Sequence, residues 1–79
     1  MIKKLVGYRI KELRINKMNL TQDEFSQKLG WDRTYLSRVE SGKQNLTIES
    51  LEKVCDVLDI TLKDFFAYMD DDHIEGGDY

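Results

Sequence analysis

The sequence of 79 residues predicts an all-α fold of five helices, on three observations. Apolar side chains recur at helical spacing through most of the chain. Proline is absent, so no helix is interrupted by its ring. Alternating β-branched runs joined by Asn-Gly turns, which would indicate strands, do not occur. We place one domain at residues 1–69, and a core this small would gain stability from dimerisation.

The first two helices are predicted from apolar faces and from a cap. The first is expected over about residues 4–17. Its apolar face consists of Val6, Ile10 and Leu13. The second begins at Thr21, whose hydroxyl can accept from the amide of Glu24 while the Glu24 carboxylate reaches back. It ends at Gly30, which tolerates the left-handed conformation of a sharp stop.

Three more helices follow from the same signals. The third starts after Asp32 as N-cap and ends before Gly42, the fourth opens after Thr47, and Thr61 caps the fifth. The expected apolar face of the third helix consists of Leu36 and Val39. That of the fourth consists of Ile48, Leu51, Val54, Cys55 and Leu58, and that of the fifth of Leu62, Phe65, Phe66 and Met69.

The composition also limits the chemistry. Cys55 is the only cysteine, expected as a small buried apolar residue, and His73 is the only histidine, so no disulfide or metal site is predicted. The chain shows no Ser/His/acid or Cys/His set and no Gly-rich phosphate loop, so we expect neither enzymatic activity nor a cofactor or small-molecule ligand. No apolar stretch approaches the roughly 18 residues of a membrane span, and no secretory segment follows Met1, which predicts a cytoplasmic protein.

The net charge of −3 is unevenly distributed. Residues 1–44 carry ten basic and five acidic side chains, whereas residues 45–79 carry two basic and ten acidic ones. Because salt screens charges beyond roughly 8–10 Å, the local field governs attraction to a polyanion. Residues 1–44 are therefore suited to binding phosphate groups. The alternative is that these charges form an ordinary solvated surface. The last ten residues, 70–79, contain five acids and predict a disordered acidic tail.

A helix-turn-helix is predicted where Gly30, Trp31 and Asp32 separate the second and third helices. Two helices joined by a three-residue turn that contains glycine cross steeply. Ser26 supplies the small residue needed at the crossing. The apolar wedge between the helices consists of Phe25, Leu29, Trp31, Leu36 and Val39.

The outer face of the third helix is predicted to contact bases. It carries Arg33, Thr34, Ser37 and Arg38. An α-helix fits the major groove of double-stranded DNA, where arginine can bond guanine in bidentate fashion and a hydroxyl can bond a base. A solvated face is the alternative, but such a face usually mixes acids with bases, and no acid lies between Arg33 and Val39.

Contacts to the DNA backbone would fix the register of the protein. Gln22 begins the second helix, where free amides suit an anion. The loop after the third helix supplies Lys43, Gln44 and Asn45. Arg9 and Lys28 are further candidates.

With these motifs, the stretch Leu13–Phe66 resembles the phage-repressor/Xre class of helix-turn-helix domains. The segments that carry the resemblance are LTQDEFSQKLG, VESGK and LDITLKDFF. It implies a compact, repressor-like fold and an ion pair between Arg14 of the first helix and Glu40 at the end of the recognition helix. The link from Arg14 to Leu20 is one residue longer than the class pattern, which should only lengthen a loop.

Within that class, DRTYLSRVESGKQNLTIESL is most similar to restriction–modification controller proteins. The resemblance implies a small homodimer that binds paired operator half-sites and times endonuclease expression. It also implies DNA contacts by Arg33, Thr34, Tyr35 and Asn45. The acidic tail has no counterpart in the pattern. The alternative is a protein-interaction module, such as an antitoxin, built on the same fold.

The fifth helix is the predicted dimer interface, because it carries more apolar surface than a small monomer usually exposes. Packing across a two-fold axis would bury Leu62, Phe65, Phe66 and Met69. Either Phe65 is internal and Phe66 lies at the interface, or the reverse. The same axis would hold two recognition helices about one DNA turn apart, roughly 34 Å, on a pseudo-palindromic operator.

Overall fold

Four α-helices and a C-terminal helical segment make up residues 2–67, the part of the chain that the computed structural model describes. The elements are α1 (Ile2–Asn16), α2 (Gln22–Leu29), α3 (Arg33–Glu40), α4 (Ile48–Leu58) and the helical residues 62–67. No strand occurs within the described part, and the predicted all-α, five-helix fold is confirmed. Met69 and the predicted tail, residues 70–79, lie outside the described residues.

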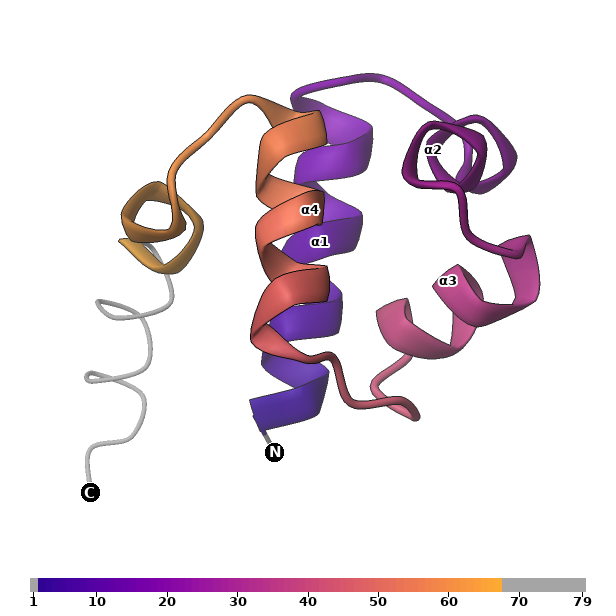
Figure 1. Cartoon of the computed structure of the whole chain (residues 1–79), viewed down its shortest axis with the longest axis horizontal. Helices are drawn as coiled ribbons and strands as arrows, with labels where there is room; N and C mark the ends of the chain where they lie inside the picture. The colour runs from indigo at the N-terminus through magenta and orange to yellow at the C-terminus, as the bar shows by residue number, and fades with distance from the viewer. Residues whose placement is uncertain (1, 68–79) are drawn as a thin grey trace.

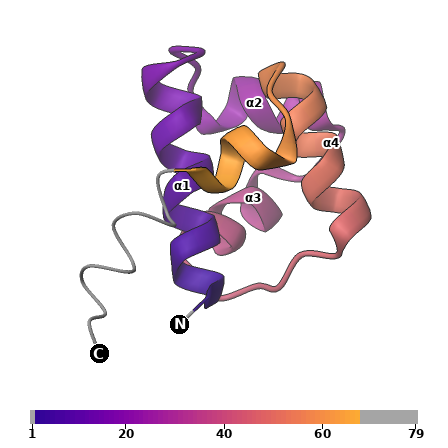
Figure 2. The same ribbon diagram turned by 90° about the vertical axis from the view of Figure 1, so that its left-hand side faces the viewer.

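The helices lie in three layers (Figure 1). The helices α1 and α4 form the middle layer, with α2 and α3 on one side. The C-terminal segment, residues 62–67, covers the other side, crossing α1 and α4 as Figure 2 shows. The buried apolar core between the layers consists of Ile10, Phe25, Leu29, Leu36, Val39, Leu51, Val54, Cys55, Leu58 and Phe65.

Threonine caps start three of the helical elements. The Thr21 hydroxyl accepts from the Glu24 amide at 3.1 Å, and the Glu24 carboxylate accepts from the Thr21 amide at 2.8 Å, which is the predicted capping box. Thr47 and Thr61 cap α4 and the C-terminal segment in the same way, each accepting from an amide at 3.0 Å. Asp32 is the N-cap of α3, as predicted, although its carboxylate makes no capping hydrogen bond.

Two apolar residues lie differently from the prediction. Phe65 is 0% exposed in the core, so of the two alternatives it is the internal ring, and listing it at the dimer interface is wrong; the C-terminal segment folds back and places this ring beneath Arg9 of α1. Its neighbour Phe66 is half-buried on the outer side of the core. Ile48 was expected on the buried stripe of α4 but is 71% exposed, because it is the first residue of the helix and the core begins at Leu51.

The helices α1 and α3 approach closely at Gly7, a residue that the sequence analysis did not single out. A Cβ atom added there would collide with the backbone carbonyl oxygens of Val39 and Glu40. A glycine inside a helix costs about 1 kcal/mol relative to alanine, so the close crossing explains its presence. Gly7 therefore sets how near the end of α3 lies to α1.

Candidate nucleic-acid interface

The turn between α2 and α3 determines the angle at which α3 is presented. Gly30 has a φ of +75°, in the left-handed region. Its amide donates to the Gln27 carbonyl at 3.2 Å, and the Trp31 amide donates to the Ser26 carbonyl at 2.9 Å. This is the hydrogen-bond pattern of a Schellman motif, which ends a helix and redirects the chain at once. Ser26, only 2% exposed, allows the two helices to approach.

The two faces of α3 differ in their surroundings. Leu36 and Val39 are 0% and 1% exposed in the core. On the outer face Arg33, Thr34 and Arg38 are exposed and Ser37 is half-buried. The first turn of α3 contains no acid. The structure thus brings the four predicted base-contacting residues to one helix and leaves their polar groups accessible to a ligand.

The residues predicted to contact the DNA backbone flank this face. The chain turns at Gly42, with a φ of +80°, and the Lys43 amide then donates to the Arg38 carbonyl at 2.9 Å, so the loop begins against the end of α3. Lys43 and Asn45 are exposed and Gln44 is half-buried, with its Oε1 accepting from Arg38 Nε at 3.5 Å.

Tyr35 lies at the other end of α3 and is half-buried. Its ring meets the Trp31 ring edge to face, with the centroids 4.9 Å apart. Such aromatic pairs restrict the orientation of both rings. The turn residue Trp31 therefore orients Tyr35 beside the outer face of α3.

A buried network holds α3 against the first two helices. Arg14 donates to both carboxylate oxygens of Glu40, from Nε at 2.8 Å and from Nη2 at 3.0 Å. Its Nη1 donates to the Leu20 carbonyl at 2.8 Å, which draws in the loop before α2. Gln22 Nε2 donates to the same Glu40 carboxylate at 2.9 Å. One carboxylate thus ties together α1, α2 and α3.

Gln22 is the first residue of α2, as predicted, and its side chain also bonds within the protein. The predicted phosphate contact rests on the free backbone amides at this helix start, and the side chain directs one Nε2 hydrogen to Glu40. The amide group carries a second N–H, and the side chain is half-buried at the start of α2. Its position therefore allows both the bond to Glu40 and a contact outward.

Arg9 does not lie on the outer surface, so its candidacy as a phosphate contact is wrong. The side chain is buried, and Nε donates to the Phe65 carbonyl at 2.8 Å while Nη2 donates to the Asp64 carbonyl at 3.0 Å. Nη1 lies 3.2 Å from Glu12 Oε1. Arg9 holds the C-terminal segment on α1. The other candidate, Lys28, is exposed.

Cys55 is 2% exposed in the core. Burial raises the pKa of its thiol, and the nearby carboxylates of Asp56 and Glu52 raise it further. The protonated thiol is a poor nucleophile and a poor metal ligand. Among residues 2–67, no group of three or more His, Cys, Asp or Glu side chains is placed to hold a metal ion. No described helix is both long and apolar enough to cross a membrane.

The sequence model of the helix-turn-helix family matches residues 10–65, which include α2, the turn and α3. The chain belongs to the helix-turn-helix family. This match confirms the predicted resemblance to repressor-like helix-turn-helix domains. The similar proteins described next confirm the predicted resemblance to controller proteins.

One relative is the control protein C.MunI of a Mycoplasma species, which is 41% identical over 66 residues, covering 84% of this chain and 89% of the relative. The crystal structure of the wild-type restriction–modification controller protein C.Esp1396I is similar, with a TM-score of 0.84 at 32% identity, covering 95% of this chain and 96% of that chain. The C.Esp1396I tetramer in complex with its natural 35 base-pair operator matches with a TM-score of 0.77 at 35% identity, over 86% and 88% of the two chains.

Proposed function

We propose that this helix-turn-helix protein is a sequence-specific DNA-binding transcriptional regulator of the restriction–modification controller type. The observation that carries the proposal is the outer face of α3, where Arg33, Thr34 and Arg38 are exposed on a helix whose opposite face is fixed in the core. A helix held rigidly on one side and polar on the other can enter the major groove without rearrangement. The similar C.Esp1396I structure with its operator supports this use of the fold.

Within this proposal, the residues divide into two roles. Arg33, Thr34, Ser37 and Arg38 contact base edges, with arginine as the strongest reader of guanine. The DNA backbone is contacted by Gln22, Tyr35, Lys43, Gln44 and Asn45. Apart from Gln22 at the start of α2, both sets belong to α3 and the loop that follows it.

The regulator acts as a homodimer on a pseudo-palindromic operator. In the C-terminal segment, Leu62 is 36% exposed and Phe66 is half-buried, which leaves apolar surface for a second copy. Phe65 has no part in this contact because it is internal. A two-fold axis through such a contact relates two α3 helices, as paired half-sites require.

Binding measurements on single variants test the base-reading role. An operator is first selected from the gene's own upstream region and from random duplexes. Replacing Arg33 by alanine should cost about 1–3 kcal/mol on the selected operator and relax the preference at one base pair. Lys43→Ala should weaken all sequences alike and reduce the salt dependence of binding. Lys11→Ala, at an exposed position of α1, is the control and should change neither quantity.

An unchanged affinity and base preference for Arg33→Ala would show that α3 does not read the groove. A chain that binds no duplex from this panel, even at low salt, would instead favour the protein-interaction module. Sedimentation equilibrium at micromolar protein tests the dimer, and a mass near 9.3 kDa with single chains binding the two half-sites independently would contradict it.

A further inference from the structure

The first turn of α1 lies directly against the loop that follows α3. A Cβ atom added at Gly42 would lie 2.5 Å from Cγ and 3.0 Å from Cα of Lys4. A side chain at position 42 would therefore push the two segments apart. The close contact keeps the start of α1 beside the next three loop residues, Lys43, Gln44 and Asn45.

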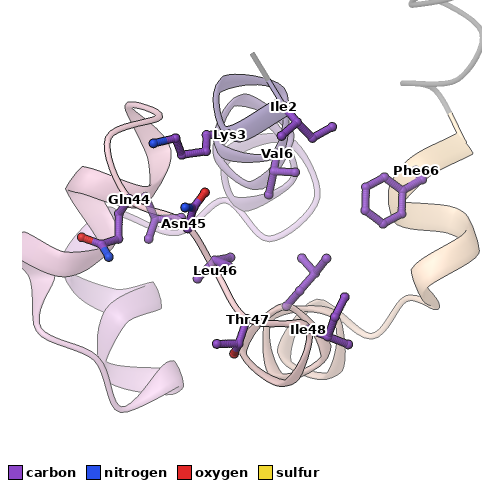
Figure 3. Close-up of a pocket in the computed structure, with 11 residues that line it drawn as sticks. Ile2, Lys3, Val6, Gln44, Asn45, Leu46, Thr47, Ile48 and Phe66 are labelled. Carbon is purple, nitrogen blue, oxygen red and sulfur yellow. The ribbon is translucent and has the colours of Figure 1, made fainter.

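Two lysines of this turn, Lys3 and Lys4, border the loop. Both side chains are exposed. Lys3 lines the same pocket as Gln44 and Asn45. Figure 3 shows the Lys3 side chain extending from α1 toward this loop, whereas Ile2 is directed to the opposite side. Both lysines therefore lie at the edge of the loop that is proposed to contact the DNA backbone.

The charges of these lysines have no partner within the described part of the chain. Neither Lys3 nor Lys4 takes part in an ion pair or a side-chain hydrogen bond among residues 2–67. The first turn of α1 contains no acid, and the helix dipole also places positive charge at that end. Lysines in this position weaken the helix, and an anion bound outside the protein would offset that effect.

We infer that Lys3 and Lys4 bind the phosphate backbone of the DNA beside the loop, so that the contact surface extends from α3 to the start of α1. The inference rests on the proposed DNA-binding function and adds two residues to its site. Charge complementarity and continuity with the loop support it, because exposed Lys43 follows Gly42 and makes the surface basic on both sides of the contact. Lysine binds phosphate as a point charge, and such contacts carry no sequence information.

The two lysines are also held in a fixed position relative to the recognition helix. The helix α1 crosses α3 closely at Gly7 and is joined to it by the ion pair of Arg14 with Glu40. A phosphate bound at the start of α1 therefore limits the angle at which α3 lies in the major groove, as contacts to the DNA backbone generally do.

The test uses Lys3→Gln and Lys4→Gln, singly and together, in the full chain. Glutamine keeps the Cβ and Cγ atoms, including the one that packs on Gly42, but removes the charge. We expect each single variant to bind the selected operator and an unrelated duplex less tightly by the same factor, at least about eightfold at 0.1 M salt. The slope of log affinity against log salt should become shallower by about 0.9 for each phosphate contact removed, and twice as much in the double variant. The helix content measured by circular dichroism should not change, because both side chains are exposed.

The matched control is Lys11→Gln, which removes the same charge from an exposed position about 10 Å further along α1 than Lys4 and should keep the wild-type slope. If the double variant has the slope of Lys11→Gln, the start of α1 does not reach the phosphates, although the proposed DNA binding would stand. A loss of affinity for the selected operator alone would also overturn the inference, because the lysines would then act on bases. If the wild-type protein binds no duplex, both the proposed function and this inference fail.

Discussion

Two arginines of α1 form ion pairs, and the pairs differ mainly in how exposed the carboxylate partner is. The side chains of Arg14 and Glu40 are 7% and 3% exposed, whereas those of Arg9 and Glu12 are 8% and 37% exposed. The two guanidinium groups are thus equally buried. The charge of Arg14 is met by a buried carboxylate, whereas among residues 2–67 that of Arg9 is met by two backbone carbonyl oxygens and a carboxylate open to water.

This difference separates two ways of attaching an element to α1. The helix α3 is held by a buried pair of charges, and loss of either partner leaves the other charge uncompensated in the interior. The C-terminal segment is held by hydrogen bonds from Arg9 to carbonyl groups, which any residue at positions 64 and 65 would supply. Within the described residues, the attachment of the recognition helix therefore depends on the identity of both ion-pair partners, whereas these hydrogen bonds of the C-terminal segment with Arg9 depend on the identity of Arg9 alone.

The largest effect is expected for Glu40→Ala. The variant leaves Arg14 and the Gln22 amide without their shared acceptor, and we expect a loss of about 3–5 kcal/mol in the free energy of unfolding, measured in urea. The double variant Arg14→Met with Glu40→Leu is the control and should lose less than Glu40→Ala, because no charge remains buried. Equal losses for the two variants would show that packing, and not the stranded charge, is what the pair supplies.

A smaller loss is expected for Gly7→Ala. Alanine favours an isolated helix by about 1 kcal/mol, but its Cβ would meet the carbonyl oxygens of Val39 and Glu40 and push α3 away from α1. We expect a net loss of about 2–3 kcal/mol, toward the upper end of the cost of overpacking. Asn16→Ala, at an exposed position of α1, is the control and should be neutral or slightly stabilising. A stabilised Gly7→Ala protein would mean that the two helices do not touch there.

These contacts also show how far the sequence predicts the molecule. The helices and the turn at Gly30 followed from periodicity and caps, because those signals are local. The pairing of Arg14 with Glu40 followed from the family resemblance, because both partners are side chains in recognisable motifs. The role of Arg9 could not be predicted in this way, because its acceptors are backbone carbonyls that leave no pattern in the sequence.

The remaining differences arise from packing between distant elements. The need for Gly7 depends on how closely α3 crosses α1, and the position of Phe65 depends on how the C-terminal segment folds back. For Ile48, apolar periodicity correctly placed the residue on the stripe of α4, but periodicity does not show where the core beneath a stripe ends. A local pattern identifies a face of a helix, and tertiary contacts decide how much of that face is covered.

Removal of the Arg9 contacts is expected to cost less than either change on the α3 side. Arg9→Met keeps the aliphatic length of the side chain but removes the donors to the Asp64 and Phe65 carbonyls, for a loss of about 1.5–2 kcal/mol. Hydrogen exchange should increase first at the amides of residues 62–67, while those of α3 remain protected. If exchange increases equally in α3, Arg9 stabilises the whole domain and not the C-terminal segment alone.

The smallest effect is expected for Glu12→Gln, which tests whether burial of the carboxylate decides the strength of an ion pair. Glu12 lies three residues after Arg9 with its side chain 37% exposed, so water already solvates the carboxylate, and the Arg9 guanidinium keeps its two carbonyl acceptors; we expect a loss of about 0.5 kcal/mol or less, as for ion pairs open to water. Because salt screens exposed charges, the small difference from wild type should disappear between 0.1 and about 1 M sodium chloride. The loss in Glu40→Ala should persist at both concentrations, since its network is out of reach of the solvent ions.

Urea unfolding of both variants at the two salt concentrations measures this directly. A loss for Glu12→Gln as large and as independent of salt as that for Glu40→Ala would contradict the comparison, because the two pairs would then be equivalent although the carboxylate side chains are 37% and 3% exposed.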